Sequence, residues 1–302
     1  MQPPASNYVK GAAFGLAAAS IWAGWSPVTR LGVTMQLSVW DVAILRFGVA
    51  GILLLPVVLR RGLALDRIGW RGLALMIIGG GVPYVLLAAT GLGFGPAHDQ
   101  AALNPGTVPL FVALIGVIAV GDKLTATRKI GLALIAAGAV VIVGCYAASW
   151  NTSRTLGHML GLAAAFLWAC FTVIMSKGKL DSLHAAALVS TGSLLIYLPI
   201  YLAMFGTRLT LLPTPDLAVQ TIYQGILVTI VSLVFYGSAM DILGMSGGAA
   251  FGALVPALTG LLAIPLLGEW PNATDWFGML LVSAGVYLAS GGPVPRITHQ
   301  YG

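Results

Sequence analysis

The stretch GLAAASIWA at residues 15–23 returns as GLAAAFLWA at residues 161–169, and seven of the nine positions are identical. A second glycine stands four residues before each copy, at Gly11 and Gly157, so each apolar segment begins with a Gly-xxx-Gly step. Such a step lets two helices in lipid approach each other closely. The copies lie 146 residues apart in a chain of 302 residues, which is about half its length. The sequence therefore predicts two copies of one membrane unit.

Positions further along each half extend the duplication. The pairs separated by 147 residues are Pro109 and Pro256, Gly121 and Gly268, Asp122 and Glu269, Gly131 and Gly278, and Gly138 and Gly285. Prolines and acidic residues align as well as glycines, so a shared bias in composition is a weak explanation. We therefore divide the chain into an N-terminal unit, residues 1–150, and a C-terminal unit, residues 151–302.

The composition predicts an all-α integral membrane protein. Hydrophobic residues make up 58% of the chain and charged residues only 8%, against about a quarter charged in a soluble domain. Successive apolar runs are near the roughly 20 residues that a helix needs to cross a bilayer. The ten predicted spans are Gly11–Val33, Trp40–Leu59, Gly69–Leu92, Gln100–Val120, Lys129–Ala147, Leu156–Met175, Ala185–Phe205, Leu217–Ala239, Met245–Leu267 and Ala273–Ser290.

Five helices in each unit are an odd number, so the second unit must enter the membrane from the opposite side. The two halves are then inverted repeats. With both termini in the cytoplasm, eleven basic residues fall on the inner side and two, Arg154 and Arg208, on the outer side, as the positive-inside rule requires. The eleven are Lys10, Arg60, Arg61, Arg67, Arg71, Lys123, Arg128, Lys129, Lys177, Lys179 and Arg296.

The formal charge of +6 does not indicate nucleic-acid binding, because the basic residues lie in short loops where they orient helices. Cys145 and Cys170 lie in apolar stretches without metal-ligand spacing, and we interpret them as small apolar residues. No nucleophile motif or phosphate-binding glycine loop is present. We expect no catalytic residue, no metal and no cofactor, and an integral membrane enzyme or receptor is the less favoured alternative.

The nine acidic residues all fall at span ends or in loops. Because a carboxylate at the bilayer centre usually marks a proton or cation relay, their positions argue against a carboxylate-driven proton antiporter. His158 and His184 also lie near span ends, and we interpret both as solvated.

Three tryptophans are candidates for a substrate pathway. Trp22 lies about eleven residues into the first span, roughly 16 Å deep, too deep for the interfacial belt in which tryptophan is common. Trp25 follows it, next to the helix-breaking Pro27, and Trp168 is the repeat counterpart of Trp22. Trp22 and Trp168 either line a central pathway or pack between helices.

The third span is interrupted by Gly81, Pro83 and Tyr84 near its middle. Proline removes a backbone donor and glycine permits a bend, and such broken helices in transporters expose polar backbone to a cavity. The fourth span begins with Asn104 and Pro105, which also favour a kink. We expect a hinge or binding site around Tyr84 and Asn104; the alternative is a static kink in which Asn104 caps freed carbonyl groups.

Other prolines and one arginine complete the candidate set. Pro109 and its counterpart Pro256 are further hinge or gate positions, together with Pro27, Gly81, Pro83 and Pro105. Arg46 lies six residues after Trp40, so it either extends outward along its long stem or faces the bundle interior. An inward arginine would bind a substrate carboxylate through charge-assisted hydrogen bonds.

This pattern resembles the EamA-type branch of the drug/metabolite transporter superfamily. The residues that carry the resemblance are Trp22-Ala23-Gly24, Arg46, and Pro109 or Pro256 followed thirteen residues later by Asp122 or Glu269. Within that superfamily the chain is similar to bacterial inner-membrane exporters of aromatic amino acids. The resemblance implies a central cavity formed mainly by spans one, three, four, six, eight and nine, which opens alternately to each side of the membrane.

The resemblance also implies the function that we expect. The chain would export small metabolites, with aromatic amino acids favoured, from the cytoplasm of a bacterial cell across the inner membrane. Without a carboxylate in the membrane it would act as a facilitator driven by the metabolite gradient. A proton-coupled exporter of drugs or other metabolites is the alternative. Substrate and membrane lipid are the expected partners, and a monomer is compatible with the sequence, which does not determine the oligomeric state.

Overall fold

The computed structural model describes residues 5–35, 37–121, 123–147, 152–206, 209, 214–244, 247–248 and 250–291. Within these residues the regular elements are all helices. They are α1 (Ala5–Met35), α2 (Val39–Arg61), α3 (Leu65–Gly80), α4 (Val82–Phe94), α5 (Ala97–Val120), α6 (Ala126–Ala147), α7 (Thr152–Lys177), α8 (Ser182–Phe205), α9 (Thr214–Gln220), η2 (Thr221–Val231), α10 (Ser232–Leu243), η3 (Ala250–Leu254), α12 (Val255–Leu267) and α13 (Ala273–Ala289). Asp122, Arg208, Arg296 and the side chain of Cys145, all named above, lie outside the described residues.

The chain is an apolar helical protein whose helices are long enough for a membrane. Eight helical segments are long and apolar enough to cross a bilayer, and α13 is apolar but shorter, with 17 residues. The 31-residue α1 lies outside this set of eight. The fold class of an integral helical membrane protein is therefore confirmed, while the count of ten spans and the inverted repeat stay predictions.

Three of the apolar segments are composite. The α3 and α4 helices meet at Gly81, where the helix breaks, and Pro83 lies in the first turn of α4. The sequence predicted this interruption. A second segment runs from α9 through the π-helix η2 into α10, and a third begins with the 3-10 helix η3 and continues as α12. Neither of those two changes in helix type was predicted.

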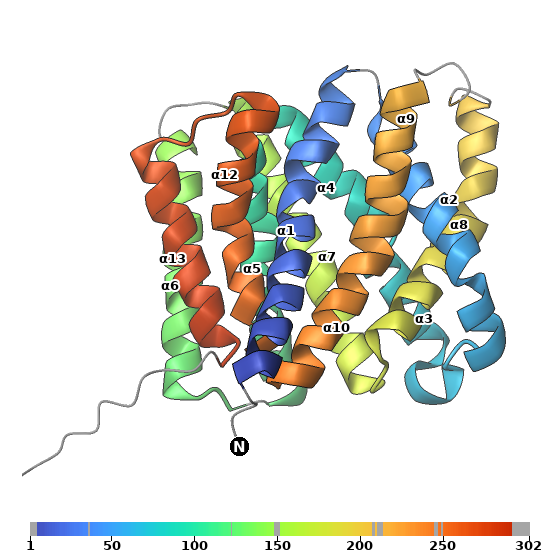
Figure 1. The fold of residues 1–302 in the computed structure, drawn as a ribbon, viewed down its shortest axis with the longest axis horizontal. Coiled ribbons are helices and arrows are strands. Elements are labelled where there is room, and N and C mark those ends of the chain that lie inside the picture. Colours follow the sequence, from blue (N-terminus) through green and yellow to red (C-terminus); the bar gives the residue numbers. More distant parts are fainter. Residues whose placement is uncertain are drawn as a thin grey trace, which may run out of the picture.

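The helices stand side by side in a single bundle (Figure 1). At the margins α6 packs along α13, and α2 packs along α8. Between these pairs α1 lies against α10 and α12, while α7 lies against α3, α4 and α5. We call the end of the bundle opposite the start of α1 the distal end; there α4 and α12 finish, and α5, α7 and α13 begin.

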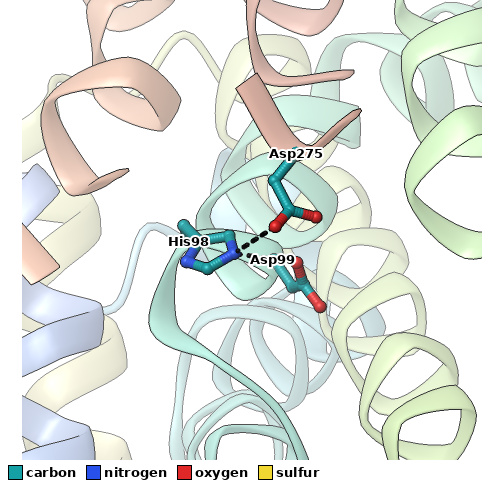
Figure 2. Close-up of side chains that lie close together, drawn as sticks. All are labelled: His98, Asp99 and Asp275. Carbon is teal, nitrogen blue, oxygen red and sulfur yellow. Dashed lines mark ion pairs between the residues drawn. The ribbon is translucent and has the colours of Figure 1, made fainter. Parts of the chain in front are cut away.

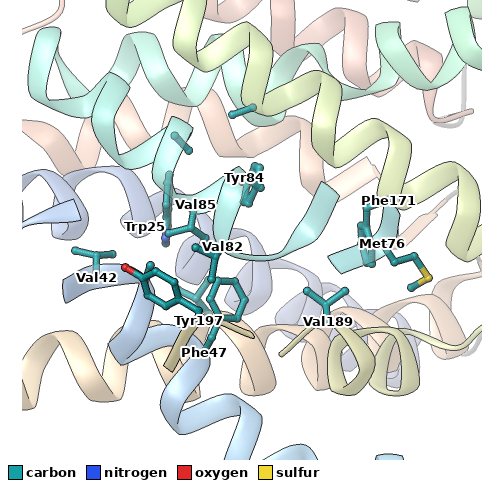
Figure 3. Packing of buried hydrophobic residues seen from close by; sticks show 14 of the residues in the cluster. Trp25, Val42, Phe47, Met76, Val82, Tyr84, Val85, Phe171, Val189 and Tyr197 are labelled. Atoms are coloured by element: carbon teal, nitrogen blue, oxygen red, sulfur yellow. The ribbon is translucent and has the colours of Figure 1, made fainter. Parts of the chain in front are cut away.

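The largest hydrophobic core lies where α1, α2, α4, α7 and α8 converge (Figure 3). Trp25, Phe47, Val85 and Tyr84 belong to it, and each is at most 9% exposed. The cluster includes two of the residues that we predicted for a substrate pathway. It therefore places Trp25 and Tyr84 in the interior of the bundle.

Candidate functional site

Tyr84 is the centre of a group of buried and half-buried side chains from four helices. Its ring centroid lies 4.8 Å from that of Trp168 on α7, at an interplanar angle of 45°. Its hydroxyl accepts a hydrogen bond from Asn104 Nδ2 on α5, at 3.3 Å. Asn104 thus bonds the tyrosine, whereas the static-kink alternative had it capping carbonyl groups freed by the helix breaks.

Arg46 on α2 faces the same tyrosine. Arg46 is only 7% exposed, and it is close enough to Tyr84 for the two side chains to interact electrostatically. Its Nε has no hydrogen-bond partner within the described part of the chain. The side chain therefore faces the bundle interior, as one of the two predicted alternatives required. We call Arg46, Tyr84, Asn104 and Trp168 the Tyr84 cluster.

The Tyr84 cluster combines a buried cationic side chain with aromatic rings. The Arg46 guanidinium also lies over the Phe47 ring, with Cζ 5.7 Å from the ring centroid. Trp168 also packs against Phe171, at a centroid separation of 5.0 Å and an interplanar angle of 54°. The Oδ1 atom of Asn104 is buried without a hydrogen-bond partner among the described residues. Buried polar atoms are normally bonded, so the Arg46 Nε donor and the Asn104 Oδ1 acceptor beside these aromatic rings are suited to a zwitterionic ligand that carries an apolar side chain.

Trp25 belongs to the same hydrophobic core as Tyr84, and a separate series of hydrogen bonds holds its indole ring. Its indole Nε1 donates to Gln224 Oε1 at 2.9 Å, and Gln224 Nε2 donates to Thr29 Oγ1 at 2.8 Å. Gln224 lies in the π-helix η2, where the Thr229 hydroxyl donates to the Gln224 carbonyl five residues earlier. π-Helical segments are rare, usually span a single turn and frequently occur at functional sites, whereas η2 has 11 residues. No pattern in the sequence predicted this π-helix.

Trp22, the other tryptophan of α1, occupies a different part of the bundle. Its indole donates to Ser232 Oγ at 2.8 Å, and its ring packs against Tyr236 at a centroid distance of 4.9 Å. Both partners lie on α10, whereas its repeat counterpart Trp168 packs on Tyr84. The two tryptophans therefore have unlike surroundings, and a role for Trp22 in the pathway stays a prediction.

The predicted hinge positions fall into two kinds. Gly81 and Pro83 mark a real break, between α3 and α4, and Pro256 lies in the first turn of α12. Pro27, Pro105 and Pro109 lie inside helices that continue past them. Whether any of these six residues acts as a hinge or gate stays a prediction.

One proline has an evident compensation. Pro27 has no N–H to donate to the carbonyl of Ala23 four residues earlier. The Thr259 hydroxyl of α12 donates to that carbonyl instead, at 2.8 Å. The carbonyl that Pro27 leaves without its partner in α1 therefore forms a hydrogen bond between α1 and α12.

A second polar group at the distal end was not predicted. Arg154 on α7 binds Asp99 of α5 with both its Nε, at 2.6 Å, and its Nη2, at 2.9 Å. His158 Nε2 lies 2.7 Å from the same carboxylate. Together with His98 of α5 and Asp275 of α13 these residues form what we call the distal network.

An ion pair between α1 and the α12–α13 connection lies at the same end. Arg30 of α1 binds Glu269 and also donates to the Leu92 and Gly95 carbonyls at the end of α4. Glu269 Oε2 accepts from the Ala97 N–H at the start of α5, at 2.8 Å. Charged contacts thus join the two halves of the chain at the distal end.

Our interpretation of two histidines as solvated is wrong. His158 is 1% exposed because it bonds Asp99. His184 is 6% exposed, with Nε2 2.9 Å from the Gly62 carbonyl. Proximity to a span end did not imply exposure, because neighbouring helices cover both rings. The only local feature of the sequence that could have indicated the burial of His158 is that Arg154 and His158 lie four residues apart, on one face of α7.

Comparison with known proteins places this chain among membrane transporters. A family model described as the EamA-like transporter family matches twice, at residues 9–144 and 155–291. An uncharacterized transporter of Archaeoglobus fulgidus is 28% identical over 274 residues, which cover 89% of this chain and 93% of that protein. A riboflavin transporter of Brucella anthropi is 27% identical over 289 residues, which cover 89% of this chain and 92% of that protein.

Two further similarities refine the comparison. A probable amino-acid metabolite efflux pump of Escherichia coli is 26% identical over 206 residues, which cover 65% of this chain and 69% of that protein. One solved crystal structure superposes with a TM-score of 0.60, at 19% identity, and covers 92% of this chain and 96% of its own. At that identity the superposition supports the fold alone.

Proposed function

The chain belongs to the EamA-like transporter family, and on this premise we propose that it exports small metabolites, with aromatic amino acids favoured, by alternating access. The relatives named above are transporters or efflux pumps rather than enzymes. We place the protein in a bacterial inner membrane with both termini in the cytoplasm, following the asymmetry of its basic loops. The observation that carries the proposal is the Tyr84 cluster.

The Tyr84 cluster provides complementary groups for an amino acid. The buried Arg46 guanidinium, whose Nε has no partner among the described residues, would bind the carboxylate through charge-assisted hydrogen bonds. The Asn104 Oδ1 atom would accept from the ammonium group. Trp168, and Phe171 beside it, would pack against an aromatic side chain.

The packing of the helices supports a two-fold relation between the halves. The first predicted span, α1, packs on the eighth and ninth, α10 and α12, and the sixth, α7, packs on the third and fourth, α3–α4 and α5. Exchanging each span for its repeat counterpart turns the first set of contacts into the second. A pseudo-two-fold axis of this kind lets one half rock against the other around a central substrate.

A proton-coupled exporter is the second candidate, and one observation favours it. Asp99 is 1% exposed and contacts both His158 and Arg154. Buried acidic residues in contact with histidine are typical of proton relays in transporters. From the sequence we expected no such residue, because Asp99 precedes the predicted span rather than lying within it.

Counterflow in liposomes tests the proposal. The purified full-length chain is reconstituted, the vesicles are loaded with unlabelled phenylalanine, and entry of radiolabelled phenylalanine is followed with and without a pH gradient. Facilitated exchange predicts saturable entry that the gradient does not change. Entry that depends on the gradient would establish the proton-coupled alternative. If aromatic amino acids and riboflavin enter no faster than they enter liposomes without the protein, transport of both classes of substrate is refuted.

A further inference from the structure

One edge of the His98 ring faces two carboxylates at the distal end of the bundle (Figure 2). Its Nε2 is 3.3 Å from Asp275 Oδ2 on α13 and 3.5 Å from Asp99 Oδ1 on its own helix, α5. The three side chains are between 1% and 5% exposed. Two helices far apart in the sequence thus bring one imidazole and two carboxylates together in a buried site.

The imidazole gains no hydrogen bond from this arrangement. Neither Nδ1 nor Nε2 of His98 has a hydrogen-bond partner within the part of the chain that the structure describes. The separations from Nε2 exceed the 2.7–3.2 Å usual for an N–H···O bond. A buried ring that has lost water without gaining a partner destabilises the fold. This cost suggests that a ligand belongs between the three groups.

The same separations are suited to a metal ion. Nitrogen and oxygen ligands bound tetrahedrally at 2.0–2.2 Å lie about 3.4 Å from one another. His98 and Asp275 are 3.3 Å apart, and His98 and Asp99 are 3.5 Å apart. The three ligand atoms that these residues offer all lie within 4.8 Å of one another. We propose that His98, Asp99 and Asp275 form a binding site for a divalent transition-metal ion such as Zn²⁺.

Neighbouring groups orient both carboxylates in the manner of an outer coordination shell. Arg154 and His158 hold Asp99, and the backbone N–H of Asn272 donates to Asp275 at 3.0 Å. Such contacts fix metal-ligating carboxylates and are worth about 10- to 100-fold in metal affinity. Two carboxylates and the Arg154 cation leave one negative charge when the imidazoles are neutral, which favours a cation.

An ion at this site would join α5 to α13. Both helices begin at the distal end, which must open and close if the protein works by alternating access, so this consequence depends on the proposed function. The bound ion would hold that end closed. Zn²⁺ should therefore not only bind to the protein but also slow transport.

Binding is tested on the purified full-length protein after treatment with a chelator. Titration calorimetry with Zn²⁺ alone near neutral pH should give one ion per chain. His98→Gln should weaken this binding at least ~10-fold. His184→Gln is the matched control, because His184 is also buried but bonds the Gly62 carbonyl at the other end of the bundle. Equal affinity in wild type and His98→Gln, or no binding to wild type, would overturn the proposal.

Cobalt provides a readout that does not depend on a variant that folds. Co²⁺ added to wild type should give the visible absorption bands of a four-coordinate ion, and Zn²⁺ should abolish them. A spectrum of aqueous Co²⁺ only would refute the site even if His98→Gln proves unstable. In liposomes Zn²⁺ should slow wild-type exchange and leave His98→Gln exchange unchanged. Binding without inhibition would retain the metal site but reject the idea that the bound ion holds the distal end closed. Absence of any exchange would refute only the proposed function.

Discussion

Gly131 of α6 and Gly285 of α13 face each other so closely that a Cβ on Gly131 would lie 2.7 Å from the Gly285 carbonyl oxygen. Seven residues further along α6, a Cβ on Gly138 would lie at the same distance from the Gly278 carbonyl oxygen. The two contacts exchange under the 147-residue repeat, because Gly278 is the counterpart of Gly131 and Gly285 that of Gly138. Four small residues therefore set how near α6 and α13 approach.

Gly131→Ala should destabilise the protein by about 1–3 kcal/mol, because the added methyl meets backbone atoms rather than mobile side chains. Gly144→Ala on the same helix is the matched control, since nothing lies within 4 Å of its Cβ position. The control should be neutral or slightly stabilising, because alanine is the better helix former by roughly 1 kcal/mol. Thermal unfolding in detergent compares the two, and equal midpoints would contradict the close packing.

Arg46→Gln should raise the KM for an amino acid roughly 10- to 100-fold, because a charge-assisted hydrogen bond contributes about 1.5–3 kcal/mol. Arg46→Lys should recover only part of the loss, since an ammonium group lacks the planar fork that binds a carboxylate. Arg71→Gln, at an exposed position, serves as the control. Initial exchange rates in liposomes measure the effect. An unchanged KM in Arg46→Gln would remove Arg46 from the binding site.

Tyr84→Phe should separate the polar and the aromatic roles of the Tyr84 cluster. The substitution removes the hydrogen bond with Asn104, worth about 0.5–1.5 kcal/mol, and leaves the ring contact with Trp168 in place. We expect a lower exchange rate with little loss of folded protein, and no change for Tyr8→Phe, whose residue is 57% exposed. Exchange at the wild-type rate in Tyr84→Phe would assign the hydroxyl to packing alone.

The sequence predicted best what local chemistry determines. The break at Gly81 follows from glycine and proline in an apolar run, and it is present between α3 and α4. The inward position of Arg46 could be stated only as one of two alternatives, because the choice depends on which helices surround α2. The pairing of Asp99 with Arg154 could not be predicted, since it joins residues 55 positions apart at the ends of two helices.

Single cysteines placed at the two ends of the bundle test the predicted orientation. In a variant without Cys145 and Cys170, Lys177→Cys at the end of α7 should react with an impermeant maleimide only from the cytoplasmic side. Trp270→Cys, whose native residue follows α12 and is 77% exposed, should react only from outside. The expectation follows from the excess of basic residues at the first of these ends. Labelling of intact cells and inverted vesicles distinguishes the sides, and the opposite pattern would invert the topology.

Asp99→Asn should be among the most damaging isosteric changes in the chain. It removes the carboxylate that binds Arg154 and His158, and it leaves the Arg154 cation, whose side chain is only 16% exposed, without its nearest counter-charge. Breaking one partner of a buried pair costs about 3–5 kcal/mol. The distal end is partly accessible, so we expect the lower part of that range. Asp66→Asn, whose side chain is 79% exposed, should change stability little.

A double variant decides whether the cost arises from the orphaned charge. If it does, Asp99→Asn combined with Arg154→Gln should be more stable than the sum of the single changes predicts, by about 0.5–3 kcal/mol. Thermal unfolding of the four proteins in one detergent completes the cycle. Strict additivity would mean that Asp99 stabilises the bundle through contacts other than Arg154. The ion pair between α5 and α7 would then not be what holds the distal end together.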